Sequence, residues 1–90
     1  MKSILVTGGA GFIGSAFARR MVQNHPDKTI VVLDKLTYAG NLDNLLPVND
    51  APNYRFEKGD IADRETVERV VETHKIDAIV NFAAESHVDR

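Results

Sequence analysis

Hydrophobic positions along this 90-residue chain fall into short apolar runs separated by amphipathic stretches. The apolar runs predict four β-strands, at Ile4–Val6, Thr29–Leu33, Tyr54–Lys58 and Ala78–Phe82. Between them, residues 12–24 and 64–74 repeat their apolar side chains at helical spacing and predict two helices. Strands that alternate with helices in this way are typical of an α/β fold with a parallel sheet.

Each predicted helix should bury one stripe of side chains. Pro26 ends the first helix, whose Arg19 and Arg20 are expected to face solvent. Its buried stripe is expected to comprise Phe12, Ile13, Ala16, Phe17 and Met21. Asp63 is the expected N-cap of the second helix. The buried stripe of that helix is expected to comprise Val67, Val70, Val71 and His74.

The order of strands and helices implies a parallel sheet with right-handed crossovers. The usual arrangement is a Rossmann-type sheet, flanked by helices, with strand order 3-2-1-4. The first and fourth strands then border a crevice between the glycine-rich residues 7–14 and residues 83–87. Residues 35–52 form a long connection with room for one helical turn near residues 44–46.

The fourth strand lies at an edge of this predicted sheet, although its sequence is almost wholly apolar. Edge strands of stable soluble proteins are usually blunted by charge, proline or a bulge. Residues 78–82 contain neither a charged residue nor a proline. We therefore expect the isolated chain to associate with itself or with a further polypeptide.

Composition narrows the range of functions. The chain has no cysteine, and its three histidines lack metal-ligand spacing, so no metal site is expected. With a net charge of −2 and no basic run longer than Arg19-Arg20, nucleic-acid binding is not expected. The apolar run at residues 4–6 is too short for a membrane span or a signal peptide, so a cytoplasmic location is expected.

The glycine-rich segment at residues 7–14 reads TGGAGFIG and joins a predicted strand to a predicted helix. In a dinucleotide-binding loop, Gly8 allows the tight turn, Gly11 lets the backbone approach a pyrophosphate, and Gly14 lets the helix lie close to the sheet. The free N–H groups at the helix start, around Phe12 and Ile13, would then point at phosphate oxygens.

Two acidic residues follow predicted strands. Asp34 lies directly after the second strand, where it can accept both hydroxyls of an adenosine ribose. Its charge would repel a 2′-phosphate, which favours NAD over NADP, whereas Lys35 could partner such a phosphate. Asp60 follows the third strand and either reaches an adenine amino group or acts as a turn or helix cap. Asn81 is interpreted as a structural bridge between strand ends.

Three segments resemble a known family: residues 7–14, residues 34–41 (DKLTYAGN) and residues 83–90 (AAESHVDR). The first resembles the cofactor loop of the extended short-chain dehydrogenase/reductase superfamily. The other two resemble the dTDP-glucose 4,6-dehydratase family of deoxysugar (rhamnose) biosynthesis. This resemblance implies that tightly bound NAD takes a hydride from C4 of the sugar, that water leaves across C5 and C6, and that the hydride returns to C6. A homodimeric parent enzyme is also expected.

The resemblance also implies roles for individual residues. The implied cofactor-binding residues are Gly8, Gly11, Phe12, Ile13, Gly14, Asp34, Lys35, Leu36, Thr37, Asp60, Ile61, Phe82, Ala83, Ala84 and Glu85. Ser86 would touch the nucleotide-sugar substrate, while His87 either shapes the sugar pocket or packs within its loop. No catalytic residue is expected in this chain.

The family's Tyr-x-x-x-Lys pair does not lie where it should in this sequence. Tyr54 and Lys58 match the spacing, but they lie in a predicted strand, where such side chains are roughly 13 Å apart instead of about 6 Å in a helix. Residues 1–90 are therefore expected to be the N-terminal portion of an NAD-binding Rossmann domain, inactive alone, with the rest outside the chain. The alternatives are a nucleotide-sugar epimerase or decarboxylase of the same superfamily, and a non-catalytic NAD-sensing module.

Overall fold

The computed structural model of the chain describes residues 2–8, 10–36 and 42–82. Its elements are β1 (Ser3–Thr7), α1 (Phe12–Asn24), β2 (Thr29–Asp34), the 3₁₀ helix η1 (Leu42–Val48), β3 (Tyr54–Lys58), α2 (Arg64–His74) and β4 (Ala78–Asn81). The predicted strands and α-helices are confirmed to within one residue at each end. Among the described residues, no helix is both long and apolar enough to cross a membrane.

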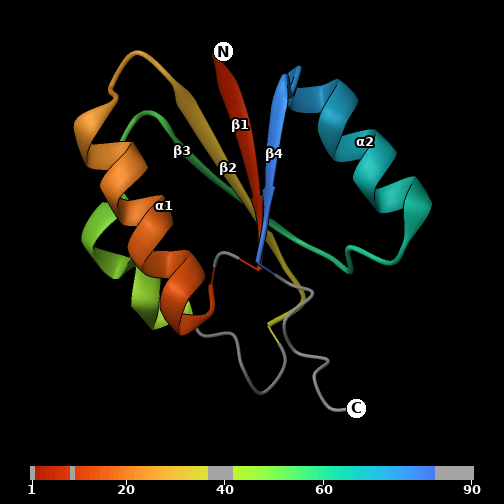
Figure 1. Cartoon of the computed structure of the whole chain (residues 1–90), viewed down its shortest axis with the longest axis horizontal. Coiled ribbons are helices and arrows are strands. Elements are labelled where there is room, and N and C mark those ends of the chain that lie inside the picture. The colour runs from red at the N-terminus through yellow and green to blue at the C-terminus, as the bar shows by residue number, and fades with distance from the viewer. Residues whose placement is uncertain (1, 9, 37–41, 83–90) are drawn as a thin grey trace.

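The strands form one parallel sheet in the order β3-β2-β1-β4, which confirms the predicted Rossmann-type topology. Thr7, at the end of β1, lies opposite Leu33 of β2 and Asn81 of β4. Figure 1 shows β1 beside β4 at the centre of the molecule, with α1 and α2 to either side. The C-terminal ends of β1, β2 and β4 therefore lie together at one end of the sheet, the lower end in this view.

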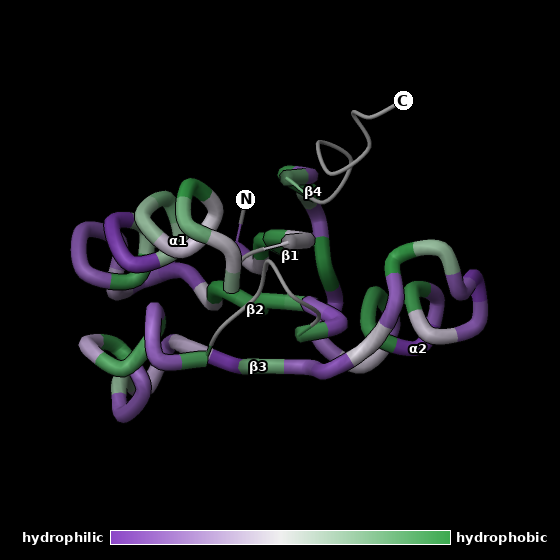
Figure 2. The backbone as a smooth tube through the Cα atoms, turned by 90° about the horizontal axis from the view of Figure 1, so that it is seen from below, coloured by the Kyte–Doolittle hydropathy of each residue, from purple (hydrophilic) through white to green (hydrophobic). Residues whose placement is uncertain are grey.

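Side chains alternate across the sheet, so each face has its own core. The core under α1 and η1 includes Ile4, Val6, Ile30, Val32, Ala18, Val22, Leu45 and Val48. The core under α2 consists of Leu5, Val31, Leu33 and Val70, with Val67 and Val71 partly buried against it. Figure 2 shows the sheet between α1 and η1 on one side and α2 on the other. This double cover explains why β2 is apolar at consecutive positions.

The buried face of α1 differs from the prediction. Phe12 and Ile13 are 86% and 61% exposed, while Phe17 and Met21 are only half-buried. The residues that α1 buries are Gly14, Ser15, Ala18 and Val22. Small side chains on this face let the helix lie close to the sheet. Phe17 and Met21 pack against the core as predicted, and the prediction was wrong at Phe12, Ile13 and Ala16, which are exposed.

Arg19 is the second correction on α1. Its NH1 group donates to the backbone carbonyl of Asn44 at 2.7 Å and to Ser15 Oγ at 3.3 Å. The side chain therefore ties α1 to η1, whereas the prediction placed it in solvent. Arg20 is exposed, as predicted.

Helix α2 follows its predicted pattern except at its N-cap. Val70 is fully buried, and Val67, Val71 and His74 are half-buried on the same face. Asp63 occupies the N-cap position, but its carboxylate accepts the Thr66 hydroxyl at 2.8 Å and caps no backbone N–H. The hydroxyl three residues on competes with the backbone for this acceptor.

Candidate cofactor-binding site

The glycine-rich loop begins where β1 ends. Gly8 has φ of 73°, in the left-handed region that side chains rarely adopt, and its N–H donates to the Leu33 carbonyl at 2.9 Å. Gly11 has φ of −75° and ψ of 176°, an extended conformation open to any residue, and its N–H donates to the Gly8 carbonyl at 3.2 Å. The tight turn therefore requires glycine at position 8, as predicted. Gly14 is buried in α1.

The start of α1 suits an anionic group. Gly11 provides no side-chain cap, and the first turn holds no acidic residue. First-turn N–H groups lack partners within their own helix and carry the positive end of its dipole. The side chains of Phe12 and Ile13 lie at the surface beside these groups. A pyrophosphate fits such a helix start.

Two backbone N–H groups hold the Asp34 carboxylate. Oδ2 accepts the Ala10 N–H at 2.9 Å, and Oδ1 accepts the Leu36 N–H at 2.8 Å. Leu36 itself adopts φ of 62°, which is uncommon for a residue with a side chain. Each carboxylate oxygen has a further lone pair, so Asp34 is able to accept the two hydroxyls of a ribose. The donors and acceptors at this edge of the sheet therefore fit NAD.

Lys35 and Asp60 lie side by side at the ends of β2 and β3. Asp60 Oδ1 accepts the Ala62 N–H at 2.9 Å, and Oδ2 lies 3.4 Å from Lys35 Nζ. The Ala62 N–H, with a smaller contribution from Lys35, holds the pKa of Asp60 below its ordinary value. The Asp60 side chain therefore stabilises the turn after β3 through the Ala62 N–H. Its contact with adenine stays a prediction. Ile61 packs partly against the core under α2.

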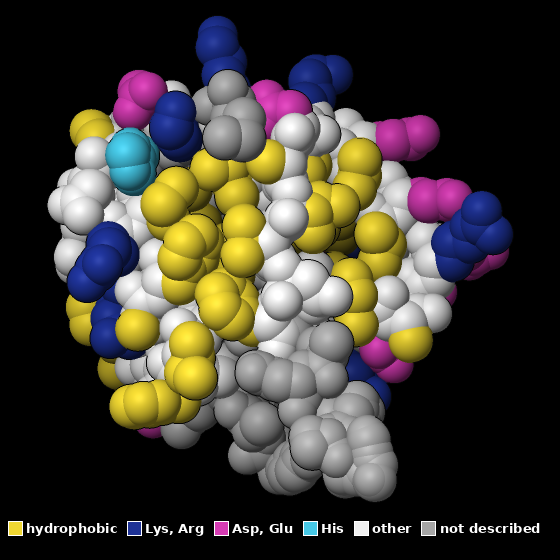
Figure 3. All heavy atoms as spheres, viewed as in Figure 1, with side chains coloured by type: hydrophobic (Ala, Val, Ile, Leu, Met, Phe, Trp, Pro, Cys, Tyr) yellow, Lys and Arg dark blue, Asp and Glu magenta, His cyan; other side chains and the backbone are white. Residues whose placement is uncertain are grey.

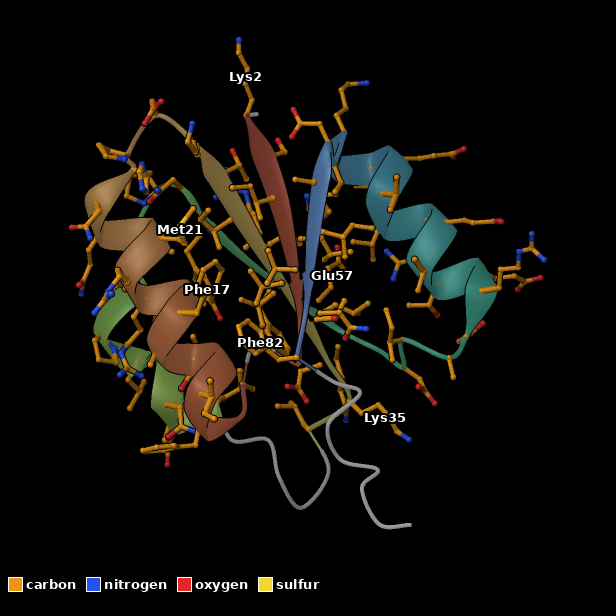
Figure 4. All side chains as sticks on the ribbon, in the orientation of Figure 1. Lys2, Phe17, Met21, Lys35, Glu57 and Phe82 are labelled. Atoms are coloured by element: carbon orange, nitrogen blue, oxygen red, sulfur yellow. The ribbon has the colours of Figure 1, made fainter. Side chains whose placement is uncertain are left out.

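The junction of β1 and β4 joins a polar bridge to an apolar surface. Thr7 Oγ1 donates to Asn81 Oδ1 at 2.6 Å, which confirms Asn81 as a bridge between strand ends. Phe82 follows, with its ring centroid 5.5 Å from that of Phe17, and Figure 4 shows the two rings together. An open hollow of about 370 Å³ is lined by Ile13, Ala16, Phe17, Arg20 and Phe82.

Several predicted site residues lie outside the described part of the chain. They are Thr37, Ala83, Ala84, Glu85, Ser86 and His87. The described ones come together through the contacts between Gly8 and Leu33, Asp34 and Ala10, and Lys35 and Asp60. Their roles toward a cofactor stay predictions.

The Tyr54 and Lys58 pair lies on β3, as expected, and lacks the helical geometry of a catalytic pair. Tyr54 is 7% exposed, and burial raises the pKa of its hydroxyl. Within the described residues that hydroxyl has no hydrogen-bond partner. In the same part of the chain, no three His, Cys, Asp or Glu side chains are grouped to hold a metal ion.

Three residues near the site were missed by sequence reasoning. Ala10 acts through its backbone, which carries no residue signature. Asn44 Nδ2 donates to the Ala10 carbonyl at 2.9 Å from the long connection between β2 and β3. A Cβ added to Gly59 would lie 2.7 Å from Thr66 Cγ2 and 3.2 Å from Leu33 Cδ1. The only sequence feature that could have indicated a role for Gly59 was its position next to Asp60.

Comparison with known proteins relates this site to one family. The family described as GDP-mannose 4,6 dehydratase matches residues 5–90. The dTDP-glucose 4,6-dehydratase of Neisseria gonorrhoeae is 57% identical over 99% of this chain, and the chain spans only 25% of that relative's length.

Solved structures give the same relationship. A crystal structure of the dTDP-glucose 4,6-dehydratase of Bacillus anthracis str. Ames, in complex with NAD, matches with a TM-score of 0.91 and 50% identity, over 96% of this chain and 28% of that one. A UDP-glucose 4-epimerase from Thermotoga maritima, with UDP-glucose, matches with a TM-score of 0.77 and 34% identity, over 93% of this chain and 25% of that one.

Proposed function

The chain belongs to the GDP-mannose 4,6 dehydratase family, and from this membership we propose that it forms the NAD-binding segment of a nucleotide-sugar 4,6-dehydratase. The proposed substrate is dTDP-glucose, which is converted to dTDP-4-keto-6-deoxyglucose in deoxysugar (rhamnose) biosynthesis. Greater similarity to the dehydratase than to the epimerase supports this choice, with 50% against 34% identity and TM-scores of 0.91 against 0.77.

One observation carries the proposal: the Asp34 carboxylate lies at the end of β2, hydrogen-bonded to the loop that leads into an uncapped helix. An acid and a helix start in this relation match the ribose and the pyrophosphate of one dinucleotide. When bound, NAD supplies the hydride acceptor for oxidation of a sugar carbon.

The residues predicted for the site, described or not, would bind and orient the cofactor. Asp34 accepts the ribose hydroxyls, and the backbone N–H groups of Phe12 and Ile13 face the pyrophosphate. Lys35, Leu36, Asp60 and Ile61 line the adenosine end, together with Thr37. Along the middle of the cofactor lie Phe82, Ala83, Ala84 and Glu85, and Ser86 touches the sugar.

Product analysis tests the reaction. A protein that contains this chain is incubated with dTDP-glucose, UDP-glucose or GDP-mannose, and the products are identified by NMR. We expect a 4-keto-6-deoxy sugar from dTDP-glucose in preference to the other two, and none from residues 1–90 alone. A 4-epimer as the only product would contradict the dehydratase assignment. A 4-keto-6-deoxy product from residues 1–90 would contradict the placement of the catalytic residues outside them.

We further propose that β4 pairs with another polypeptide in a cytoplasmic protein. Ile79 is 54% exposed on this edge strand. Figure 3, in the view of Figure 1, shows hydrophobic side chains gathered on both sides of β4. In isolation, a second copy of the chain would cover this edge. In a longer, homodimeric parent, a further part of the chain would cover it. Sedimentation and thermal melting of residues 1–90 test the proposal. A monomer that melts cooperatively above about 50 °C, as mesophile domains do, would contradict it.

A further inference from the structure

Asn44 connects η1 to the glycine-rich loop. Its side chain is half-buried, and Nδ2 donates to the Ala10 carbonyl at 2.9 Å across 34 residues of sequence. Its own backbone carbonyl accepts Arg19 NH1 at 2.7 Å. Asn44 therefore contacts both the loop that precedes α1 and a side chain of α1 itself.

The peptide between Ala10 and Gly11 is held at both ends by these contacts. The Ala10 carbonyl accepts Asn44 Nδ2, and the Gly11 N–H donates to the Gly8 carbonyl at 3.2 Å. The Ala10 N–H donates in turn to Asp34. Asn44 of η1, Asp34 of β2 and the loop's own Gly8 thus fix the backbone immediately before the N-terminus of α1.

The position of η1 does not depend on the Asn44 side chain. Leu45 and Val48 are only 1% and 3% exposed in the core under α1. The Arg19 contact uses the backbone carbonyl of residue 44, which any residue provides. Loss of the Asn44 amide therefore frees the Ala10 carbonyl, loosens the loop at that peptide and leaves η1 anchored.

We propose that Asn44 is a positioning residue for the cofactor's pyrophosphate. The inference rests on the proposed NAD binding by this loop. A loop whose peptide planes are already fixed loses little conformational freedom when a ligand binds, whereas a released loop must be ordered at that moment. Asn44 acts through the loop backbone and need not touch the cofactor.

The test compares ADP, which carries a pyrophosphate, with adenosine, which does not. Binding of each to the protein and to its Asn44→Ala variant is measured by NMR titration. A cooperative unfolding transition in denaturant first establishes that the variant is folded. We expect about three- to tenfold weaker ADP binding, the scale for ordering one or two groups, with adenosine binding changed by less than about twofold. Asn49→Ala, at an exposed asparagine just after η1, is the matched control and should bind both ligands as the parent does.

If Asn44→Ala does not fold, Asn44→Leu replaces it, because leucine has nearly the same shape and no donor. Unchanged ADP binding, or an equal loss of ADP and adenosine binding, would overturn the inference. Should the unmutated protein bind neither NAD nor ADP, the proposed function fails and the inference falls with it.

Discussion

Asp34 and Ala10 are joined by a hydrogen bond of 2.9 Å between a carboxylate oxygen and a backbone N–H, across 24 residues of sequence. The other carboxylate oxygen accepts the Leu36 N–H. The acid proposed to recognise the ribose therefore also holds the glycine-rich loop. One side chain both binds and arranges the site, so its removal should be felt in stability as well as in affinity.

Replacing Asp34 with alanine should destabilise the fold. Two backbone N–H groups lose a charged acceptor, and hydrogen bonds to charged groups contribute roughly 1.5–3 kcal/mol each at most. We expect a loss of about 1–3 kcal/mol in the free energy of unfolding, measured with denaturant, because the N–H of Ala10, a residue that is 0% exposed, is left without its acceptor. Asp50→Ala, at an exposed aspartate before β3, is the control. Equal stability of the two variants would contradict the structural role of Asp34.

Gly59 should not tolerate a side chain. Its added Cβ would approach Thr66 Cγ2 to 2.7 Å, and the Thr66 hydroxyl is bonded to Asp63, which restricts that side chain. Gly59→Ala should therefore lower the free energy of unfolding by about 1–3 kcal/mol, the usual scale of overpacking.

A substitution at Thr66, the residue nearest to the added Cβ, provides the control for Gly59→Ala. Thr66→Ser removes Cγ2 and keeps the hydroxyl, so the double variant Gly59→Ala/Thr66→Ser should regain part of the lost stability. The residual loss reflects Leu33 Cδ1, which lies 3.2 Å from the same Cβ. If the serine substitution restores nothing, the Thr66 contact is not the cause.

Glu57 gives the fold an acid-dependent contact between β3 and α2. Its carboxylate lies 2.7 Å from His74 Nε2 and 3.4 Å from Arg69 NH1. The His74 hydrogen bond, aided by Arg69, holds the pKa of Glu57 below its ordinary value of 4.5. Because the folded pKa is lowered, this stabilisation is present above pH 4.5 and is lost as the pH falls through the folded value.

Unfolding experiments across this range test the contact. The parent should be more stable than Glu57→Gln near pH 6, by at most about 1 kcal/mol for a partly exposed group. The difference should shrink as the pH falls below 4.5. Glu72→Gln, at an exposed position of α2, should show no such trend. A difference that persists unchanged far below pH 4.5, where the Glu57 carboxyl is protonated in the folded protein too, would contradict the assignment.

The ion pair of Lys35 with Asp60 bears on cofactor choice. Lys35 Nζ lies 3.4 Å from Asp60 Oδ2, so the ammonium group is paired with that carboxylate. Lys35 directly follows Asp34, the residue expected to repel a 2′-phosphate. Figure 4 shows Lys35 extending from the end of β2. Asp60→Asn keeps an oxygen for the Ala62 N–H and frees Lys35. We expect the ratio of NADP to NAD affinity to rise by about two- to fivefold, the scale of a surface ion pair.

A double-mutant cycle shows whether Lys35 causes the change in the ratio of NADP to NAD affinity. In a Lys35→Met background, Asp60→Asn should shift the ratio less, because no ammonium group is left to meet the phosphate. The same shift with and without Lys35 would mean that Asp60 acts by its own charge. Equal weakening of both cofactors would instead indicate contact with adenine.

The sequence was sufficient for the features that local chemistry determines. Gly8 adopts the left-handed turn expected of it, and β2 is covered on both faces as its apolar run predicted. Asn81 bridges β1 and β4 as predicted, although it is exposed and not buried as the sequence suggested. The strand order observed is the usual one for a sheet of this type, as expected from the alternation of strands and helices.

Contacts between distant segments were beyond the sequence. Nothing local indicates that Asn44 reaches Ala10 or that Arg19 turns toward η1, because both contacts arise when two separate segments pack. The face of α1 was misjudged because large apolar side chains were preferred to the small ones that permit close packing. Phe12 and Ile13 satisfied the helical period and still lie at the surface.

The most direct test of this account is an equilibrium titration of NAD and NADP against the protein and its Asp34→Ala variant. We expect the parent to bind NAD more tightly than NADP. We also expect the variant to lose about 1–3 kcal/mol of NAD binding, the scale for a hydrogen-bonded charge, and most of its preference between the two cofactors. Equal affinities of the parent for both cofactors, a preference for NADP, or unchanged NAD binding by the variant would contradict it.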